Sequence, residues 1–273
     1  MSITQKLKKG AAWTLGRALP IQKNKVVFSS FYGRGASDNP KAIVDALAQR
    51  PEKLDIVWLA KDPAHAGVPD NVRVVPYDTP AAIRELSTAR VWVDNCRKGA
   101  HVKKDGQYYM QTWHGFALKR IERDVADKLN TPENAAYAEY AKRDSAQIDA
   151  IISNSTFMTE IYQKSFWYHG AVLEYGSARN DILVHPPADA KHQVQQALHL
   201  PNDCQIIMYA PTFRADHSLD AYQLDYQAVC RACAQRFGGN WVMLVRLHPN
   251  VMKLAKDLKF DNRTTFDATA VDD

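Results

Sequence analysis

The sequence alternates short apolar segments with segments that favour helix, and this pattern limits the fold more than any other feature. Short buried strands that alternate with helices are typical of a parallel β-sheet with helices on both faces. The pattern therefore predicts an α/β fold. The expected strands are Lys25–Phe31, 54–60, 72–76, 90–94, 108–113, 149–153, 171–175, 205–210 and 241–247. The expected helices are 41–49, 131–147, 188–199 and 222–237.

The alternation breaks at His185-Pro186-Pro187, which we interpret as a linker between two domains. The predicted lobes are residues 25–185 and 188–273, preceded by a separate segment at 1–24. The second lobe has only two or three expected strands, whereas a complete doubly wound domain usually has about five or six. We therefore expect an incomplete second lobe whose exposed sheet edge favours self-association.

The N-terminal segment is strongly basic. Residues 1–25 hold six basic residues and no acidic one, so they carry +6 and the rest of the chain carries −1 of the total +5. Apolar residues recur there at a spacing of four, as in an amphipathic helix, and Pro20 ends the pattern. The basic residues are Lys6, Lys8, Lys9, Arg17, Lys23 and Lys25.

This basic helix has two interpretations. It lies on an anionic membrane surface, where each basic residue contributes roughly 1 kcal/mol, or it packs on its own domain with its lysines in water. Basic and aromatic residues do not interleave further along the chain. Nucleic acid is therefore not expected as a partner.

Several other classes of protein are not expected. The best apolar runs, such as Trp241–Leu247, are far shorter than the roughly 18 residues of a membrane-spanning helix, and this one contains an Arg. No secretory signal follows the basic N-terminus. Four cysteines are too few for a disulfide framework. We interpret Cys230 and Cys233 as packed thiols on a helix, and no metal-binding motif is present.

Two polar clusters in the first lobe follow expected strands, and sheets of this type bind ligands at the carboxyl ends of their strands. Gly33-Arg34-Gly35 precedes Ser37-Asp38-Asn39-Pro40, a helix start with a capping side chain and a Pro in its first turn. The glycines either cradle an anion or form a plain tight turn. His114, in Gln111-Thr112-Trp113-His114-Gly115, is either a hydrogen-bonded structural residue or a general base.

Two further clusters are rich in Arg. The first is Gly176-Ser177-Ala178-Arg179-Asn180-Asp181, where Arg179 is a candidate phosphate ligand and Asp181 a candidate helix cap. The second combines Ala210-Pro211-Thr212-Phe213-Arg214 with Arg246-Leu247-His248-Pro249 at neighbouring strand ends. Because Arg binds phosphate oxygens through two parallel hydrogen bonds, the clusters together indicate an anionic ligand, with phosphate the natural choice.

These motifs, taken in order, resemble the CDP-glycerol glycerophosphotransferase family, the polymerases and primases of bacterial teichoic-acid and capsule synthesis. The motifs are Ser37-Asp38-Asn39-Pro40, Gln111-Thr112-Trp113-His114-Gly115 with Leu118-Lys119, Arg179-Asn180-Asp181, Ala210-Pro211-Thr212-Phe213-Arg214 and Arg246-Leu247-His248-Pro249. They extend over about 215 residues. The resemblance implies a GT-B-like architecture, in which two Rossmann-like lobes face a cleft, with the second lobe incomplete here.

The resemblance also implies a reaction. A hydroxyl of a lipid-linked polymer acceptor attacks the β-phosphorus of CDP-glycerol, and CMP leaves. His114 is then the candidate base, Arg246 and His248 neutralise the donor pyrophosphate, and Arg214 and Arg179 are further phosphate contacts. Phosphoryl transfer depends on positioning and charge stabilisation, so no metal or other cofactor is required. The supporting residues are Trp113, Gly115, Lys119, Asn180, Asp181, Asp38 and Asn39.

The resemblance further implies a peripheral protein at the cytoplasmic face of the bacterial membrane, which agrees with a basic amphipathic helix. Phe116-Ala117 stands where the family often has Thr-Pro, and Gly176-Ser177-Ala178 where it usually has Gly-Tyr-Pro. Family members also continue past the point where this chain stops. The alternatives are a ribitol-phosphate or sugar-phosphate transferase, a nucleotide-sugar glycosyltransferase, and a truncated, non-catalytic membrane-peripheral relative.

Overall fold

The computed structural model describes residues 3–98, 101–128, 131–212, 218–248 and 251–269, with side chains from residue 9 onward. The chain divides into two compact units, Met1–Val184 and His185–Asp273. Each unit has a parallel sheet of its own. Phe213, Arg214 and Pro249 of the sequence motifs lie outside the described residues.

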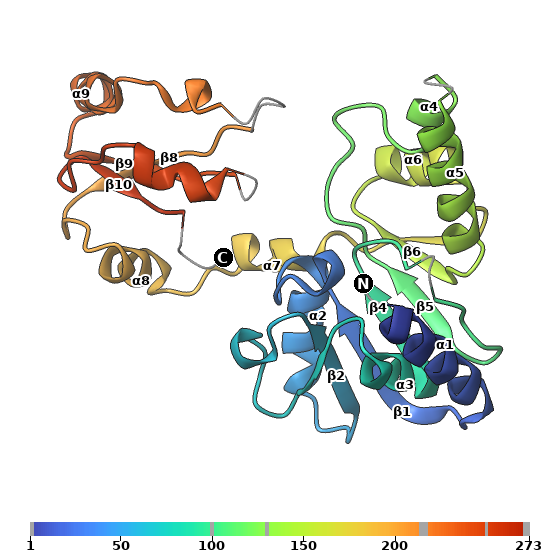
Figure 1. Ribbon diagram of the computed structural model, residues 1–273. Coiled ribbons are helices and arrows are strands. Elements are labelled where there is room, and N and C mark those ends of the chain that lie inside the picture. Colours follow the sequence, from blue (N-terminus) through green and yellow to red (C-terminus); the bar gives the residue numbers. More distant parts are fainter. Residues whose placement is uncertain (1–2, 99–100, 129–130, 213–217, 249–250, 270–273) are drawn as a thin grey trace. The chain divides into compact units, whose positions relative to one another are not determined.

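The first unit is built on a seven-stranded sheet in the order β3-β2-β1-β4-β5-β6-β7 (Figure 1). All six neighbouring pairs in this sheet are parallel. The strands are β1 (Gln22–Ser29), β2 (Asp55–Ala60), β3 (Arg73–Pro76), β4 (Ala89–Asp94), β5 (Tyr108–Gln111), β6 (Ala150–Ser153) and β7 (Ala171–Glu174). The α/β class predicted from the alternating pattern is confirmed.

Helices connect these strands. The α-helices of the first unit are α1 (Ile3–Ala18), α2 (Asp38–Ala48), α3 (Pro80–Thr88), α4 (Arg123–Ala126), α5 (Pro132–Ser145), α6 (Thr156–Ser165) and α7 (Asp181–Val184). Short 3-10 helices are η1 (Phe31–Gly33), η2 (Pro63–His65) and η3 (Ala178–Asn180).

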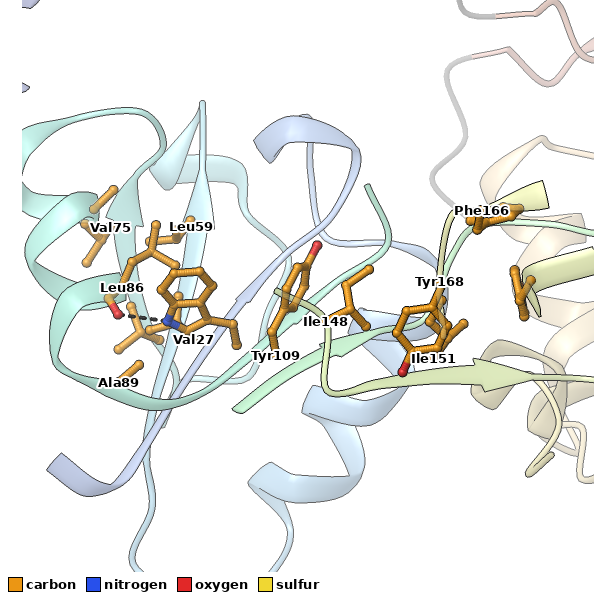
Figure 2. Packing of buried hydrophobic residues seen from close by; sticks show 14 of the residues in the cluster. Val27, Leu59, Val75, Leu86, Ala89, Tyr109, Ile148, Ile151, Phe166 and Tyr168 are labelled. Atoms are coloured by element: carbon orange, nitrogen blue, oxygen red, sulfur yellow. Dashed lines mark hydrogen bonds between the residues drawn. The ribbon is translucent and has the colours of Figure 1, made fainter. Parts of the chain in front are cut away.

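Alternate residues of each central strand face opposite sides of the sheet, as the period of two in a strand requires. Val26 and Phe28 of β1 belong to one buried cluster with Val44 of α2. Val27, between them, belongs to the other cluster with Leu86 of α3 and Met158 of α6. Figure 2 shows part of this second cluster. Both faces of the sheet are therefore covered.

The order of the strands creates a switch point between β1 and β4. The chain runs from β1 to β2 and β3 on one side, and then returns to place β4 on the other side of β1. Ser29 pairs with Asp94, and Asp94 with Gln111, so the carboxyl ends of β1, β4 and β5 are level. A crevice at such a point is where open α/β sheets bind their ligands.

Helix α1 packs on the first unit, beside α3 (Figure 1). The ring of Trp13 lies 5.1 Å from that of His101, and Lys104 Nζ donates a hydrogen bond of 2.6 Å to Leu19 O. Burial lowers the pKa of His101 to about 3. Packing on its own domain, one of the two interpretations of the basic helix, is therefore present in the structure.

The second unit has a three-stranded parallel sheet in the order β10-β9-β8. Its strands are β8 (Gln205–Tyr209), β9 (Trp241–Val245) and β10 (Thr265–Asp267). Its helices are α8 (Ala190–Ala197), α9 (Tyr226–Phe237), η4 (Asp220–Tyr222) and η5 (Met252–Asp257). Val194 of α8 packs in one cluster with Val242 and Phe266, and Cys230 of α9 packs in another with Met243 and Val245.

Several predicted element boundaries are wrong by a few residues. The strand predicted at Lys25–Phe31 begins at Gln22 and ends at Ser29, because Phe31 and Tyr32 adopt left-handed backbone conformations. The strand predicted at 108–113 ends at Gln111 because Trp113 is also left-handed. The helix predicted at 222–237 begins at Tyr226, where Asp225 caps Ala228 N. Strand β10 was not among the predicted strands.

Candidate functional site

The loop between β5 and α4, residues 112–122, carries His114 and is called the His114 loop below. It leaves the sheet beside the switch point, because β5 is the neighbour of β4. The imidazole of His114 is stacked on the Trp113 ring at 4.3 Å and is tilted against the Phe31 ring at 5.7 Å. The first unit thus presents His114 at the edge of the sheet where its ligand is expected.

Residues from two distant segments hold the main chain of the His114 loop. Asn39, buried at the start of α2, donates from Nδ2 to Trp113 O at 3.4 Å. Arg179 donates from Nη1 to His114 O at 3.2 Å and to Asp38 Oδ2 at 2.9 Å. The Arg179 main-chain N–H donates to Asn39 Oδ1 at 3.2 Å. Three of the sequence motifs therefore meet here.

The structure places Arg179 in a salt bridge that joins these motifs. The Asp38 side chain is 3% exposed and that of Arg179 is 40% exposed, so the carboxylate is buried while the Arg179 side chain reaches the solvent. The capping side chain expected in the Ser37-Asp38-Asn39-Pro40 motif is not seen at the N-cap position, because Ser37 makes no capping hydrogen bond. Asp38 Oδ1 instead accepts a hydrogen bond of 2.6 Å from Asn39 N.

The surroundings of His114 favour its neutral form. Burial lowers the pKa of His114, and the charge of Arg179 lowers it further, while Asp38 and Glu122 act in the opposite direction. A lowered pKa leaves the imidazole unprotonated at neutral pH, and this is the form that accepts a proton.

The backbone around His114 is strained. Phe31, Tyr32, Asp38 and Trp113 all have positive φ, between 42° and 64°. Non-glycine residues adopt such angles rarely, and the surrounding structure must hold them there. Gly33 leaves no room for a side chain, because a Cβ there would lie 2.6 Å from the Tyr77 ring. This favours the tight-turn interpretation of the Gly33-Arg34-Gly35 segment.

A buried group of charges beneath the His114 loop was missed by the sequence analysis. Arg97 is 4% exposed, and it donates to Glu122 Oε2 at 2.8 Å and to Asp144 Oδ2 at 3.3 Å. The neighbouring Lys98 forms an ion pair of 2.6 Å with Asp94. Burial raises the pKa of Asp144 to about 6. Two consecutive basic residues just after the buried strand 90–94 were the signal that could have revealed this group.

The other supporting residues of the first unit lie near the surface. Lys119 is exposed on the His114 loop, and Gly115 is half-buried. Asn180 ends η3, and Asp181 is the first residue of α7.

In the second unit, Arg246 and His248 follow β9. Arg246 N donates to Tyr209 O at 3.0 Å, which keeps the end of β9 level with that of β8. His248 N donates to Tyr222 Oη at 3.1 Å, and the Tyr222 hydroxyl donates to Pro211 O at 3.3 Å. The residues that follow β8 and β9 are therefore linked within this unit.

Within the described ranges, no group of three or more His, Cys, Asp or Glu side chains has a metal-binding arrangement. Cys230 is buried on α9, where burial raises its thiol pKa, and Cys233 lies three residues further on.

Among the described residues, no helix has both the length and the apolar character needed to cross a membrane.

A family model described as CDP-Glycerol:Poly(glycerophosphate) glycerophosphotransferase matches residues 12–272. The chain belongs to this family. It is 31% identical over 235 residues to a teichoic acid poly(glycerol phosphate) polymerase of Staphylococcus epidermidis, covering 84% of this chain and 33% of that one. It is also 31% identical over 236 residues to a teichoic acid glycerol-phosphate transferase of Staphylococcus aureus, covering 83% of this chain and 60% of that one.

The fold is similar to that of the wall teichoic acid polymerase TagF. One TagF structure matches with a TM-score of 0.81 and 27% identity, covering 100% of this chain and 71% of that one. Another, soaked with CDPG, matches with a TM-score of 0.77. The chain thus spans most of the TagF chain but only 33% and 60% of the two staphylococcal relatives.

Proposed function

We propose that this protein transfers glycerol phosphate from CDP-glycerol to a hydroxyl group of a lipid-linked glycerophosphate or capsule acceptor. The acceptor oxygen forms a bond to the β-phosphorus, and the bond between that phosphorus and the bridging oxygen breaks. CMP leaves with the electron pair of that bond. The observation that carries the proposal is the placement of His114 in a chain of the glycerophosphotransferase family. Its lowered pKa favours the neutral imidazole, and Arg179 holds its main chain beside the carboxyl ends of β1, β4 and β5.

His114 is the general base in this proposal. It takes the proton of the acceptor hydroxyl as the new bond forms, which such a base typically accelerates by about 10²–10⁴-fold. Its stacking on Trp113 limits rotation of the ring. The Arg179 and Asn39 contacts fix the main chain on either side of the imidazole. A fixed base is what a positioning mechanism requires.

Arg246 and His248 are proposed to neutralise the pyrophosphate of the donor. Arg binds phosphate oxygens through two hydrogen bonds, and a His ring N–H donates to a leaving oxygen. Arg214 is a further proposed phosphate contact. For Arg179, the salt bridge with Asp38 supports a role in holding the His114 loop in addition to any phosphate contact. The chemistry needs no metal or other cofactor.

The test is CMP release from CDP-glycerol, with lipid-linked or soluble glycerophosphate as acceptor. His114→Ala is expected to lower turnover at least about 100-fold and to leave CDP-glycerol binding nearly unchanged. Arg246→Ala is expected to weaken binding of the donor as well. Near wild-type turnover in His114→Ala would remove His114 as the base. Faster turnover with CDP-ribitol than with CDP-glycerol would favour the ribitol-phosphate alternative.

We also propose that the protein works at the cytoplasmic face of the membrane. The His114 loop supports this, because Leu118 is 88% exposed and the basic residues Lys119 and Arg120 follow it directly. The exposed ring of Phe116 is stacked on that of Phe157 at 5.1 Å. Apolar and basic side chains at one surface are typical of proteins that bind anionic lipid.

Co-sedimentation with phosphatidylglycerol vesicles tests the membrane proposal. Leu118→Asp should reduce the bound fraction severalfold, whereas Val102→Asp, a matched exposed apolar position outside the His114 loop, should not. Equal binding of both variants and the parent protein would contradict it.

Self-association is a separate prediction. It is supported by β8, which lies at the edge of the second unit's sheet with Met208 57% exposed. Light scattering that shows only a monomer would refute it.

A further inference from the structure

The buried side chain of Arg97 contacts the His114 loop at both of its ends. Arg97, which follows β4, lies with its guanidinium carbon 5.9 Å from the centre of the Trp113 ring, at the first end of the loop. The same guanidinium donates from Nη2 to the carboxylate of Glu122, at the other end. The residues between these two contacts include His114 and the exposed Lys119.

Arg97 is itself held from several sides. Its Nη1 donates to Ala141 O and to Ser145 Oγ, both at 3.0 Å, in the last turns of α5. The Phe166 ring lies 5.4 Å from its guanidinium carbon and packs edge-on against the Trp113 ring at 4.7 Å. A guanidinium with this many partners has little freedom to move.

Glu122 has an unusual backbone for a residue with a side chain. Its φ of 56° and ψ of −123° belong to a region that glycine favours. Its carboxylate is buried, and Oε1 accepts a hydrogen bond of 2.6 Å from the Tyr137 hydroxyl in addition to the Arg97 bond at Oε2. Interactions of the side chain therefore keep this residue in a strained conformation that glycine would adopt more readily.

We propose that Arg97 and Glu122 are positioning residues for the transfer reaction, which together clamp the His114 loop at both ends. Neither residue touches substrate in this proposal. Arg97 acts through the Trp113 ring, on which the His114 imidazole is stacked, and Glu122 acts by closing the loop onto Arg97. The proposal rests on the proposed function for its catalytic part, while its structural part stands on the contacts alone.

The principal test substitutes Glu122→Gln, which keeps the size of the side chain and removes its charge. Hydrogen exchange of peptides within residues 112–122 is expected to become at least about fivefold faster. With CDP-glycerol, kcat is expected to fall about tenfold while KM changes less than about twofold, because the base is displaced and donor binding is not.

Glu85→Gln is the matched control. Glu85 is also a partly buried carboxylate in an ion pair, 2.7 Å from Lys25 Nζ, and it belongs to α3 rather than to the His114 loop. This variant is expected to lower the melting temperature and to leave both kcat and the exchange of residues 112–122 unchanged. If Glu122→Gln behaves like Glu85→Gln, the role of Glu122 is only structural and the proposal is overturned.

Glu122→Gly provides a second variant that relieves the backbone strain and is expected to fold. If the clamp is real, its His114 loop also exchanges faster than in the parent protein, although its melting temperature is nearly preserved. Unchanged exchange in Glu122→Gly would overturn the clamp. If the parent protein releases no CMP, the proposed function fails, and the exchange measurements still decide whether the clamp exists.

Discussion

At the residue scale, the imidazole of His114 lies between the Trp113 and Phe31 rings, and its protonation depends on the groups around it. Burial lowers its pKa, and the charges that act on it are Asp38, Arg179 and Glu122. Since the lowered pKa lies below the ordinary value of about 6.5, the imidazole of His114 is neutral at pH 7. If His114 is the base, activity should fall on the acid side of the pH profile as the imidazole becomes protonated.

Asp38→Asn should move this loss of activity to still lower pH. The Asp38 carboxylate raises the pKa of His114 and also pairs with Arg179. Its removal takes away one raising effect and leaves burial and the Arg179 charge, which both lower the pKa, opposed only by Glu122. The measurement is the pH dependence of kcat/KM on its acid side. At pH 8 the kcat/KM of Asp38→Asn should stay within about threefold of that of the parent protein. Removal of a general base, by contrast, typically lowers the rate by about 10²–10⁴-fold.

The control for this prediction is Asp45→Asn on the same helix. Asp45 forms an ion pair of 2.5 Å with Lys41 and is not among the groups that shift the His114 pKa. Its pH profile should match that of the parent protein. An acid limb that moves to higher pH in Asp38→Asn would mean that His114 is not the titrating base.

At the element scale, the two glycines of α1 differ in their surroundings. A Cβ at Gly10 would meet nothing within 4 Å, whereas a Cβ at Gly16 would lie 2.8 Å from Ser87 Cβ of α3. Gly16 therefore permits α1 to approach α3 closely, while Gly10 only weakens the helix. Glycine inside a helix costs roughly 0.5–1 kcal/mol relative to alanine.

Gly10→Ala and Gly16→Ala should therefore change stability in opposite directions. We expect Gly10→Ala to raise the free energy of unfolding by up to about 1 kcal/mol, and Gly16→Ala to lower it by about 1–3 kcal/mol through overpacking. Urea denaturation of the two variants measures both values. Equal, stabilising effects would show that α1 does not depend on its close contact with α3.

The ends of elements were harder to predict than their centres. The centres of β1, β5 and β9 follow from runs of apolar residues. The ends of β1 and β5 are set by Phe31, Tyr32 and Trp113, whose positive φ values no local pattern indicates. Such conformations are stabilised by tertiary contacts, and Asn39 and Arg179 supply these for the main chain of Trp113 and His114.

At the scale of the whole molecule, each unit has a hydrophobic core of its own. Among the described residues, none of the four buried clusters combines side chains of the two units. Residues 181–189, where the units divide, are all exposed, and Leu183 is 76% exposed. A segment without burial opens at little cost in free energy.

Limited chymotrypsin digestion should cut first within residues 181–189. Leu183 is the expected site, and two fragments that remain folded should accumulate before either is degraded. Leu183→Ser should slow this first cut severalfold. Mass spectrometry identifies the sites. Initial cuts spread over both units at similar rates would contradict independent cores.

The sequence by itself determined the α/β class, the approximate positions of β1 to β9, and the family to which the chain belongs. These follow from local features, because apolar periodicity and short motifs are properties of neighbouring residues. It also singled out the motifs that contain His114, Asp38 with Asn39, and Arg179. The order of the residues did not show that these three motifs contact one another.

Only the tertiary structure joined them. Arg179 lies 141 residues from Asp38 in sequence, yet the packing of η3 against α2 brings the two into a salt bridge. The same packing put Arg97 against both ends of the His114 loop, at Trp113 and Glu122, although neither Arg97 nor Glu122 belongs to a motif. Contacts between distant segments depend on strand order and register, and these are fixed by the burial of the whole sheet rather than by any single segment.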